Sequence, residues 1–412
     1  MKNFLVHSDE VKKEMLSSIG VSTIEDLFKQ IPEKARMGEL DLPDALSEME
    51  VQKRVKLLAK KNNTDYISFA GGGTYNKFIP ACISQVANRF EFLTAYTPYQ
   101  PEISQGTLQV MYEFQTMICR LTGMDISNAT MYDCATACAE SILMAVRISK
   151  KNKVLVSNRL NPEYIDVIKT YTWANDIELQ LFDNMPENVE DFGCVLVQNP
   201  DYYGELQEYK KPNTLLIVCV DVSSLSIIEP PLDADIVVGD VQTLGIPMSF
   251  GGPYAGFLAC KEQYMRQIPG RLAGKTVDAD GKTAYCLTIQ TREQHIKREK
   301  ATSNICSNQA LIGLCATLYL TVMGEKGFRQ AGYLSSKNAH TLADGLKAKR
   351  IKVLNTSFYN EFVIEVGSAD KFLKKLKSKG IIGGIKIDDK KVLVCATEMN
   401  TEEEIEKYLK TV

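Results

Sequence analysis

The stretch between residues 130 and 260 alternates short, continuous apolar runs with patterns of helical period. The runs predicted to be strands are 153–157, 177–181, 194–198, 215–220, 235–238 and 255–259, with helices at 135–148 and 162–173. A strand that is apolar at successive positions is typical of a sheet covered by helices on both faces. The pattern therefore predicts an open, mostly parallel α/β sheet, with ligands at the carboxyl ends of its strands.

The residues before this region predict a helical arm. Ser8 is placed to cap a first helix, a second helix follows Ser22 and ends at Pro32, and a third covers 46–57. Such an arm is too short to bury a core of its own. We expect it to pack on the main body or on a partner.

The residues after 260 predict a hairpin, two helices and a smaller α/β domain. The turn Asp278–Gly281 resembles a hairpin tip, and helices are expected at 308–324 and 327–347. Strand, helix, strand and helix then follow, the last opened by a capping box from Thr401 to Glu404. The predicted domains are a helical arm, a large α/β domain and a small C-terminal α/β domain, at 1–62, 63–325 and 326–412.

Composition narrows the function classes. The net charge of −3 gives no sign of a nucleic-acid partner, and no apolar run approaches the roughly 18 residues that span a membrane. The N-terminus lacks an apolar secretory core, so we expect a cytoplasmic protein. The 11 cysteines include no Cys-x-x-Cys pair; Cys134 and Cys138 can share a helix face. We interpret the cysteines as small buried hydrophobes and expect no metal site.

The glycine run at 71–73 permits close approach of the backbone. A phosphate cradle is one interpretation, but no Walker lysine follows at the required spacing. A structural or interface turn is the favoured alternative.

Two polar positions follow predicted strands where ligands are expected. Asp221 ends the run 215–220, and Gln242 lies in the loop after 235–238. This arrangement resembles the type I pyridoxal-phosphate enzymes, the aminotransferase-like fold, in which an Asp pairs with the pyridinium nitrogen and a lysine holds the cofactor. The resemblance places Gln242 at the lysine position, and a carboxamide cannot form a Schiff base. Thr136 and the start of its helix remain able to hold an anion.

Three longer segments are similar to the glycine cleavage P-protein, glycine dehydrogenase (decarboxylating). They are 92–109, 251–257 and 292–307, and the resemblance extends over essentially the whole chain. The length corresponds to the amino-terminal half of the single-chain enzyme, which is a separate subunit 1 in some bacteria. The resemblance implies that subunit 2 carries the lysine and the pyridoxal phosphate.

The resemblance also implies an activity and partners. Together the subunits would decarboxylate glycine and pass the aminomethyl group to the lipoyl arm of the H-protein. A two-plus-two heterotetramer of subunits 1 and 2 is implied. Because active sites of type I enzymes lie between subunits, we expect this chain to complete the partner's site. The alternative is a non-catalytic scaffold or regulatory subunit that only stabilises subunit 2.

The candidate catalytic residues lie in one segment rich in proline and aromatic residues: Tyr96, Tyr99, Gln100, Glu102 and Gln105. Rigid loops that hold polar groups suit substrate positioning. An interface loop without ligand contact is the alternative.

The candidate cofactor contacts are Thr302, Ser303 and Asn304, as donors to the phosphate on the partner. Capping of the helix at 308–324 explains these three residues equally well. A basic cluster lies beside them, consisting of Arg292, Lys297, Arg298 and Lys300. This cluster is expected to meet an acidic H-protein surface or a substrate carboxylate, or else to form surface ion pairs.

A self-sufficient pyridoxal enzyme would need another lysine. Lys261 and Lys275 are the nearest in sequence. Lys261 follows the end of the strand 255–259, so we expect it on the wrong side of the sheet for this role.

Overall fold

The computed structural model describes residues 7–38, 40–306 and 308–412. The chain divides into two compact units, Met1–Thr64 and Asp65–Val412. The predicted arm, 1–62, ends close to this division, and its first six residues lie outside the described ranges.

The first unit contains α1 (Asp9–Ser18), α2 (Glu48–Ala59) and two 3-10 helices, and none of its described residues is buried. Ser8 caps α1 as predicted, because its side chain accepts from the Val11 N–H at 3.4 Å. The predicted second helix is only the 3-10 helix Ile24–Phe28. A segment this short gains too few backbone hydrogen bonds to propagate as an α-helix.

The second unit is built on a seven-stranded sheet of order β2-β8-β7-β6-β5-β3-β4. The five strands from β7 to β4 are parallel. At one edge, β8 is antiparallel to β7, and β2 is antiparallel to β8. The strand bounds are β2 (Ile126–Ser127), β3 (Lys153–Ser157), β4 (Glu178–Phe182), β5 (Cys194–Gln198), β6 (Leu215–Asp221), β7 (Ile236–Asp240) and β8 (Gly256–Cys260). The predicted mostly parallel sheet is therefore confirmed.

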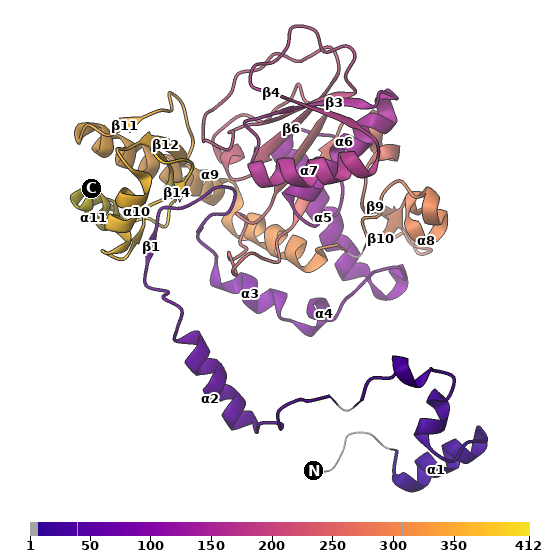
Figure 1. Ribbon diagram of the computed structural model, residues 1–412. Helices are drawn as coiled ribbons and strands as arrows, with labels where there is room; N and C mark the ends of the chain where they lie inside the picture. Colours follow the sequence, from indigo (N-terminus) through magenta and orange to yellow (C-terminus); the bar gives the residue numbers. More distant parts are fainter. Residues whose placement is uncertain (1–6, 39, 307) are drawn as a thin grey trace. The chain divides into compact units, whose positions relative to one another are not determined.

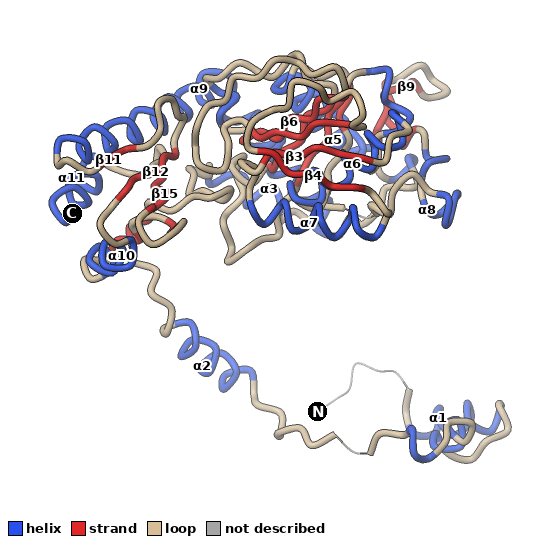
Figure 2. Tube along the Cα trace, turned by 45° about the horizontal axis from the view of Figure 1, so that its top comes forward, coloured by secondary structure: helices blue, strands red, loops and turns tan. Residues whose placement is uncertain are grey.

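Helices cover both faces of this sheet, as Figures 1 and 2 show. α6 (Cys134–Ser149) and α7 (Pro162–Ala174) pack on one face, and α5 (Gln105–Thr122) and α9 (Ala310–Ala348) contribute to the core on the other. Along β3, Val154 and Val156 belong to the core on the α6 and α7 side, and Leu155 belongs to the core on the α5 and α9 side. Burial on both faces explains the continuous apolar runs.

Shorter elements complete this part of the chain. The predicted hairpin is confirmed, with β9 (Leu272–Val277) and β10 (Thr283–Thr288) antiparallel around the Asp278–Gly281 turn. The remaining helices here are α3 (Ala81–Ala87), α4 (Phe90–Leu93) and α8 (Gln294–Lys297).

α9 leads from the large sheet to a second sheet. The helix is interrupted at Gly324, whose φ of 59° and ψ of −178° are not helical, so it matches the two predicted helices. Among the described residues it is the one helix long and apolar enough to cross a membrane, a test that core helices of soluble proteins also pass. Ala316 and Tyr319 of α9 are buried in the core of this unit.

The second sheet is four-stranded and antiparallel, of order β11-β12-β15-β14. Its strands are β11 (Lys352–Val353), β12 (Glu361–Glu365), β14 (Ile385–Lys386) and β15 (Lys391–Cys395), with helices α10 (Ala369–Lys377) and α11 (Glu402–Thr411). The Thr401 capping box forms as predicted. A short parallel pair, β1 (Ile67–Ser68) with β13 (Ile381–Ile382), joins an early segment of the chain to this region.

Candidate active-site residues and the remnant pocket

A small cavity of about 30 Å³ lies at the carboxyl ends of β6 and β7. Asp221, Asp240 and Gln242 line this remnant pocket together with Tyr75 and Cys219. Asp221 and Asp240 are partners in the register of the two strands. These polar residues thus meet at the carboxyl ends of the strands, the position that the sequence analysis gives to Asp221 and Gln242.

The carboxamide of Gln242 is fully used in contacts with the protein. Its Oε1 accepts from the Tyr75 N–H at 3.0 Å, while its Nε2 donates to the Tyr75 carbonyl at 3.0 Å and to the Ile246 carbonyl at 2.8 Å. The residue is only 2% exposed. Gln242 therefore joins the segment around Tyr75 to its own loop, using an acceptor that an ammonium group lacks.

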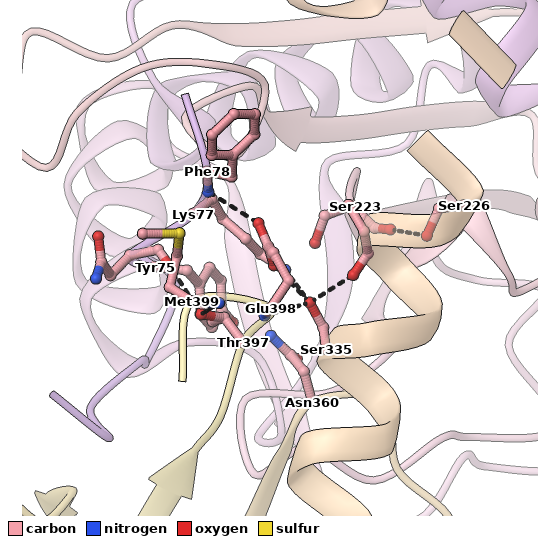
Figure 3. Close-up of polar contacts among 12 residues, drawn as sticks. Tyr75, Lys77, Phe78, Ser223, Ser226, Ser335, Asn360, Thr397, Glu398 and Met399 are labelled. Carbon is pink, nitrogen blue, oxygen red and sulfur yellow. Dashed lines mark hydrogen bonds and ion pairs between the residues drawn. The ribbon is translucent and has the colours of Figure 1, made fainter. Parts of the chain in front are cut away.

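A buried ion pair lies close to this cavity, between Lys77 and Glu398 (Figure 3). The Lys77 Nζ is 3.2 Å from the Glu398 carboxylate and donates to the Ser335 hydroxyl at 2.8 Å. Burial alone lowers the pKa of Lys77, but the acidic groups Tyr359, Glu398 and Asp221 outweigh it and raise that pKa. The charge is thus retained inside the protein, and the contact links residues 321 positions apart.

Asp221 is held by its own loop. Its carboxylate accepts from the backbone N–H and the hydroxyl of Ser223, both at 2.9 Å. Burial raises the pKa of Asp221, while the Lys77 charge and the Ser223 hydrogen bonds oppose the rise. Asp221 therefore has partners within the chain.

The glycine run packs against a buried carboxylate. The Gly72 N–H donates to Glu361 Oε1 at 2.6 Å, and a Cβ on Gly71 would lie 2.3 Å from the same oxygen. Tyr75 donates its hydroxyl to the other Glu361 oxygen at 2.9 Å. This close packing favours the structural-turn interpretation over the phosphate cradle.

The start of α6, where an anion was expected, is capped by Asp133. Its carboxylate accepts from the Thr136 N–H at 2.7 Å, and Thr136 is 8% exposed. A capping carboxylate takes the place that an anion would occupy at a helix N-terminus.

The predicted catalytic segment has a fixed base and an exposed tip. Gln105 donates to the Tyr285 carbonyl and accepts from the Tyr285 N–H, both at 2.9 Å, which ties the segment to β10. Tyr96 is 79% exposed, and Gln100 and Glu102 are also exposed. Gln105 thus supports the loop, and Tyr96, Gln100 and Glu102 project from it.

Arg271 joins Tyr99 of this segment to Glu293, which precedes the predicted cofactor contacts in sequence. The Arg271 Nη2 donates to the Tyr99 hydroxyl at 3.2 Å, and Arg271 Nε is 3.7 Å from the Glu293 carboxylate. The Tyr99 and His295 rings are 5.2 Å apart. Sequence reasoning missed Arg271, which is 3% exposed and lies in no predicted motif.

The predicted cofactor contacts line a larger, open cavity. Thr302, Ser303 and Asn304 border a space of about 720 Å³ together with Arg147 and Arg298. The capping alternative is wrong, because α9 begins at Ala310 and its N-cap is Gln309. Ser303 instead accepts from the Ile305 N–H at 3.1 Å within its own loop.

The basic cluster divides into two kinds of residue. Arg292 is 8% exposed and donates to the carbonyls of Ile268, Ile289 and Gly270, so its role is structural. Lys297, Arg298 and Lys300 are exposed, and none of them has an ion pair within the described part of the chain. The surface ion pairs expected as an alternative are therefore not found among these residues.

The remaining lysine candidates lie away from the cavity. Lys261 forms an ion pair of 3.3 Å with Asp235. Asp235 precedes β7, so the pair lies at the amino ends of the parallel strands, opposite to the cavity. Lys275 belongs to the β9–β10 hairpin and does not line the cavity.

The profile of the glycine cleavage system P-protein matches residues 2–412. The chain belongs to this family. The probable glycine dehydrogenase (decarboxylating) subunit 1 of Maricaulis maris is 40% identical, over 99% of this chain and 98% of the relative. The protein of the same name from Solibacter usitatus is 43% identical, over 96% of this chain and 94% of the relative. Both matches cover nearly the full length of each protein.

Solved structures place the P-protein fold among the type I pyridoxal-phosphate enzymes. A crystal structure of glycine decarboxylase (P-protein) of the glycine cleavage system, in inhibitor-bound form, superposes with a TM-score of 0.93 at 38% identity, covering 100% of this chain and 99% of that one. An alanine–glyoxylate aminotransferase from Nostoc superposes with a TM-score of 0.56 at 14% identity, over 92% of this chain and 97% of that one. The second match shows the fold alone.

Proposed function

We propose that this chain is the subunit of a two-part glycine decarboxylase that completes the active site of subunit 2. The observation that carries the proposal is Gln242. It stands at the position that the family resemblance gives to the cofactor lysine, and its carboxamide makes three hydrogen bonds to the chain itself. A position so firmly engaged in structure is not available for covalent catalysis.

The residues around the remnant pocket do not fit pyridoxal phosphate. The cavity of about 30 Å³ is far below the roughly 300 Å³ at which small-molecule sites begin. Asp133 already caps the helix that would meet the phosphate. We therefore assign the cofactor to the partner subunit and no chemical step to this pocket.

The exposed tip of the catalytic segment supports a role across the interface. Tyr96, Gln100 and Glu102 are exposed, while Gln105 and Tyr99 hold the segment in place. In this proposal the tip orients glycine in the partner's site. Gln105 and Tyr99 then act as positioning residues.

Thr302, Ser303 and Asn304 would contact the phosphate of the partner's cofactor. They border the 720 Å³ cavity, where the buried Nε of Arg147 lacks a hydrogen-bond partner within the described residues. An arginine and hydroxyl groups at one cavity suit an anion. Glu140 lines the same cavity, so we expect the phosphate to lie away from its carboxyl group.

The wider assembly follows from the same proposal. The chain acts in the cytoplasm in a two-plus-two heterotetramer, and the aminomethyl group of glycine passes to the lipoylated H-protein. The exposed Lys297, Arg298 and Lys300 provide a basic surface for an acidic H-protein.

The first test uses absorbance near 420 nm after addition of pyridoxal phosphate. This chain alone, subunit 2 alone and their mixture are compared, and glycine decarboxylation is assayed in each. We expect a colourless subunit 1, a coloured subunit 2 and activity only in the mixture. A borohydride-fixable chromophore on this chain alone would overturn the proposal.

The second test separates the catalytic role from a scaffold role. We expect Tyr96→Ala and Glu102→Gln to lower turnover at least 10-fold in a complex that elutes at the wild-type position. Tyr333→Ala is the matched control, because Tyr333 is also an exposed tyrosine and lies on α9, outside the segment. Loss of assembly with Tyr96→Ala, or unchanged turnover, would favour the scaffold alternative.

A further inference from the structure

Three buried thiols meet between α6 and β6. Cys134 and Cys138 lie on the first two turns of α6, and Cys219 lies on β6. Their sulfur atoms are all within 4.8 Å of one another, and the Cys134 and Cys219 sulfurs are 3.4 Å apart. Each residue is at most 2% exposed. The sequence places Cys134 and Cys138 one helical turn apart. The fold adds Cys219, which is 85 positions from Cys134.

The spacing of these thiols suits a tetrahedral metal ion. Zn–S bonds of about 2.3 Å place neighbouring sulfurs about 3.8 Å apart, within a few tenths of an ångström of the Cys134–Cys219 separation. Two ligands come from one face of a helix and the third from a packed strand, so the backbone already fixes their directions. Among the described residues this is the one such group of potential metal ligands.

Two of the three thiols line the remnant pocket. Cys134 and Cys219 line the 30 Å³ cavity with Asp221, Asp240 and Thr243. Thr243 is 5% exposed, and its hydroxyl has no hydrogen-bond partner within the described residues. The cavity has room for a water molecule, and the two carboxylates favour a cation over an anion.

We propose that Cys134, Cys138 and Cys219 bind Zn(II), with a water in the cavity as the fourth ligand. On binding, each thiol loses its proton to solvent and its S–H bond is replaced by a Zn–S bond, with no change of oxidation state. Three thiolates and one Zn(II) ion carry a combined charge of −1. A monovalent ion would leave a larger negative charge buried in the protein. The ion would join α6 to β6 and is independent of the glycine reaction.

Cobalt(II) is the probe, because tetrahedral thiolate coordination gives it charge-transfer and d–d absorption bands. The reduced, metal-free full chain is titrated anaerobically with Co(II) and then with Zn(II). We expect one equivalent of cobalt to produce the bands and one equivalent of zinc to remove them. Zinc is also expected to raise Tm.

Cys134→Ser, Cys138→Ala and Cys219→Ser are expected to lose the bands and the zinc-dependent rise in Tm. The matched control is Cys194→Ser, because Cys194 is an equally buried thiol outside the cluster. If a variant fails to fold, the cobalt bands of the wild-type chain and their loss on addition of one equivalent of zinc still decide the question. Absence of thiolate–cobalt bands, their persistence in the cluster variants, or binding of Cu(I) without Zn(II) would overturn the proposal.

Discussion

The remnant pocket and the Tyr96–Gln105 segment differ in how their polar groups are used. Around the pocket, Gln242, Lys77 and Glu398 are buried and bonded within the chain, and only about 30 Å³ of space remains. In the segment, Tyr96 is 79% exposed, although Gln105 anchors its base. The difference teaches that the carboxyl ends of the central strands are packed as a structural core, while the polar groups that remain free to meet a ligand or a partner lie in surface loops.

The Lys77–Glu398 pair is expected to show the largest effect. In Glu398→Ala the Lys77 ammonium stays buried without its carboxylate, which costs about 3–5 kcal/mol. Urea unfolding measures the loss. Glu402→Ala is the control, because Glu402 pairs with Lys337 at an exposed site and should cost under about 0.5 kcal/mol. Equal effects of the two changes would mean that the pocket is not a buried ionic core.

Glu361 is expected to make stability depend on pH. Burial raises its pKa from 4.5 to about 8, so the folded chain keeps a proton that the unfolded chain releases. This contribution is complete below pH 4.5 and is lost as the pH rises to about 8, on the order of a few kcal/mol. Unfolding free energies between about pH 5 and pH 8 should fall more steeply for wild type than for Glu361→Gln. Parallel profiles would contradict the expectation.

The Gln242→Lys variant tests whether the pocket can bind pyridoxal phosphate once it has a lysine. The lysine cannot accept from the Tyr75 N–H, and an unpaired buried donor costs about 1–3 kcal/mol. We expect this loss of stability and no absorbance near 420 nm with added pyridoxal phosphate. Gln263→Lys, at an exposed glutamine, controls for the added charge. A cofactor adduct on the introduced amine would show that the pocket opens more readily than its packing indicates.

The smallest effects are expected in the exposed segment. Tyr99→Phe removes only the hydroxyl that accepts from Arg271 and should cost about 1 kcal/mol. Tyr96→Ala should cost less than about 0.5 kcal/mol, because most of that ring is already in water. Thermal unfolding of this chain alone measures both. A larger cost for Tyr96→Ala would place its ring in the fold rather than at a ligand.

The sequence predicts the parts of this molecule that depend on local pattern. The strand at 194–198, the Asp278–Gly281 turn and the Thr401 capping box are confirmed because period, turn chemistry and caps are encoded within a few residues. The segment 105–122, which forms α5, carried no prediction although its apolar residues recur at helical spacing. The orientation of β8 also needed its partners, since an apolar run does not reveal strand direction.

The candidate site was predictable in its segments and not in its contacts. Tyr99 and Glu293 were both within noted motifs, but Arg271, which joins them, lies in neither. Arg292 was grouped with exposed cations because its charge is visible in sequence and its carbonyl partners are not. The Lys77–Glu398 pair likewise depends on chain segments that only the fold brings together.

Gln242 also bears on how this chain can evolve. Glutamine and lysine codons differ at a single nucleotide, so a mutation that introduces an amine at this position arises readily. The protein around that position nevertheless makes contacts that need both the acceptor and the donor of a carboxamide, to Tyr75 and Ile246. Several neighbouring residues would have to change before the amine became useful, and selection for stability removes the intermediates. Under the proposed function, the division of labour between two subunits is therefore hard to reverse, although the genetic step is small.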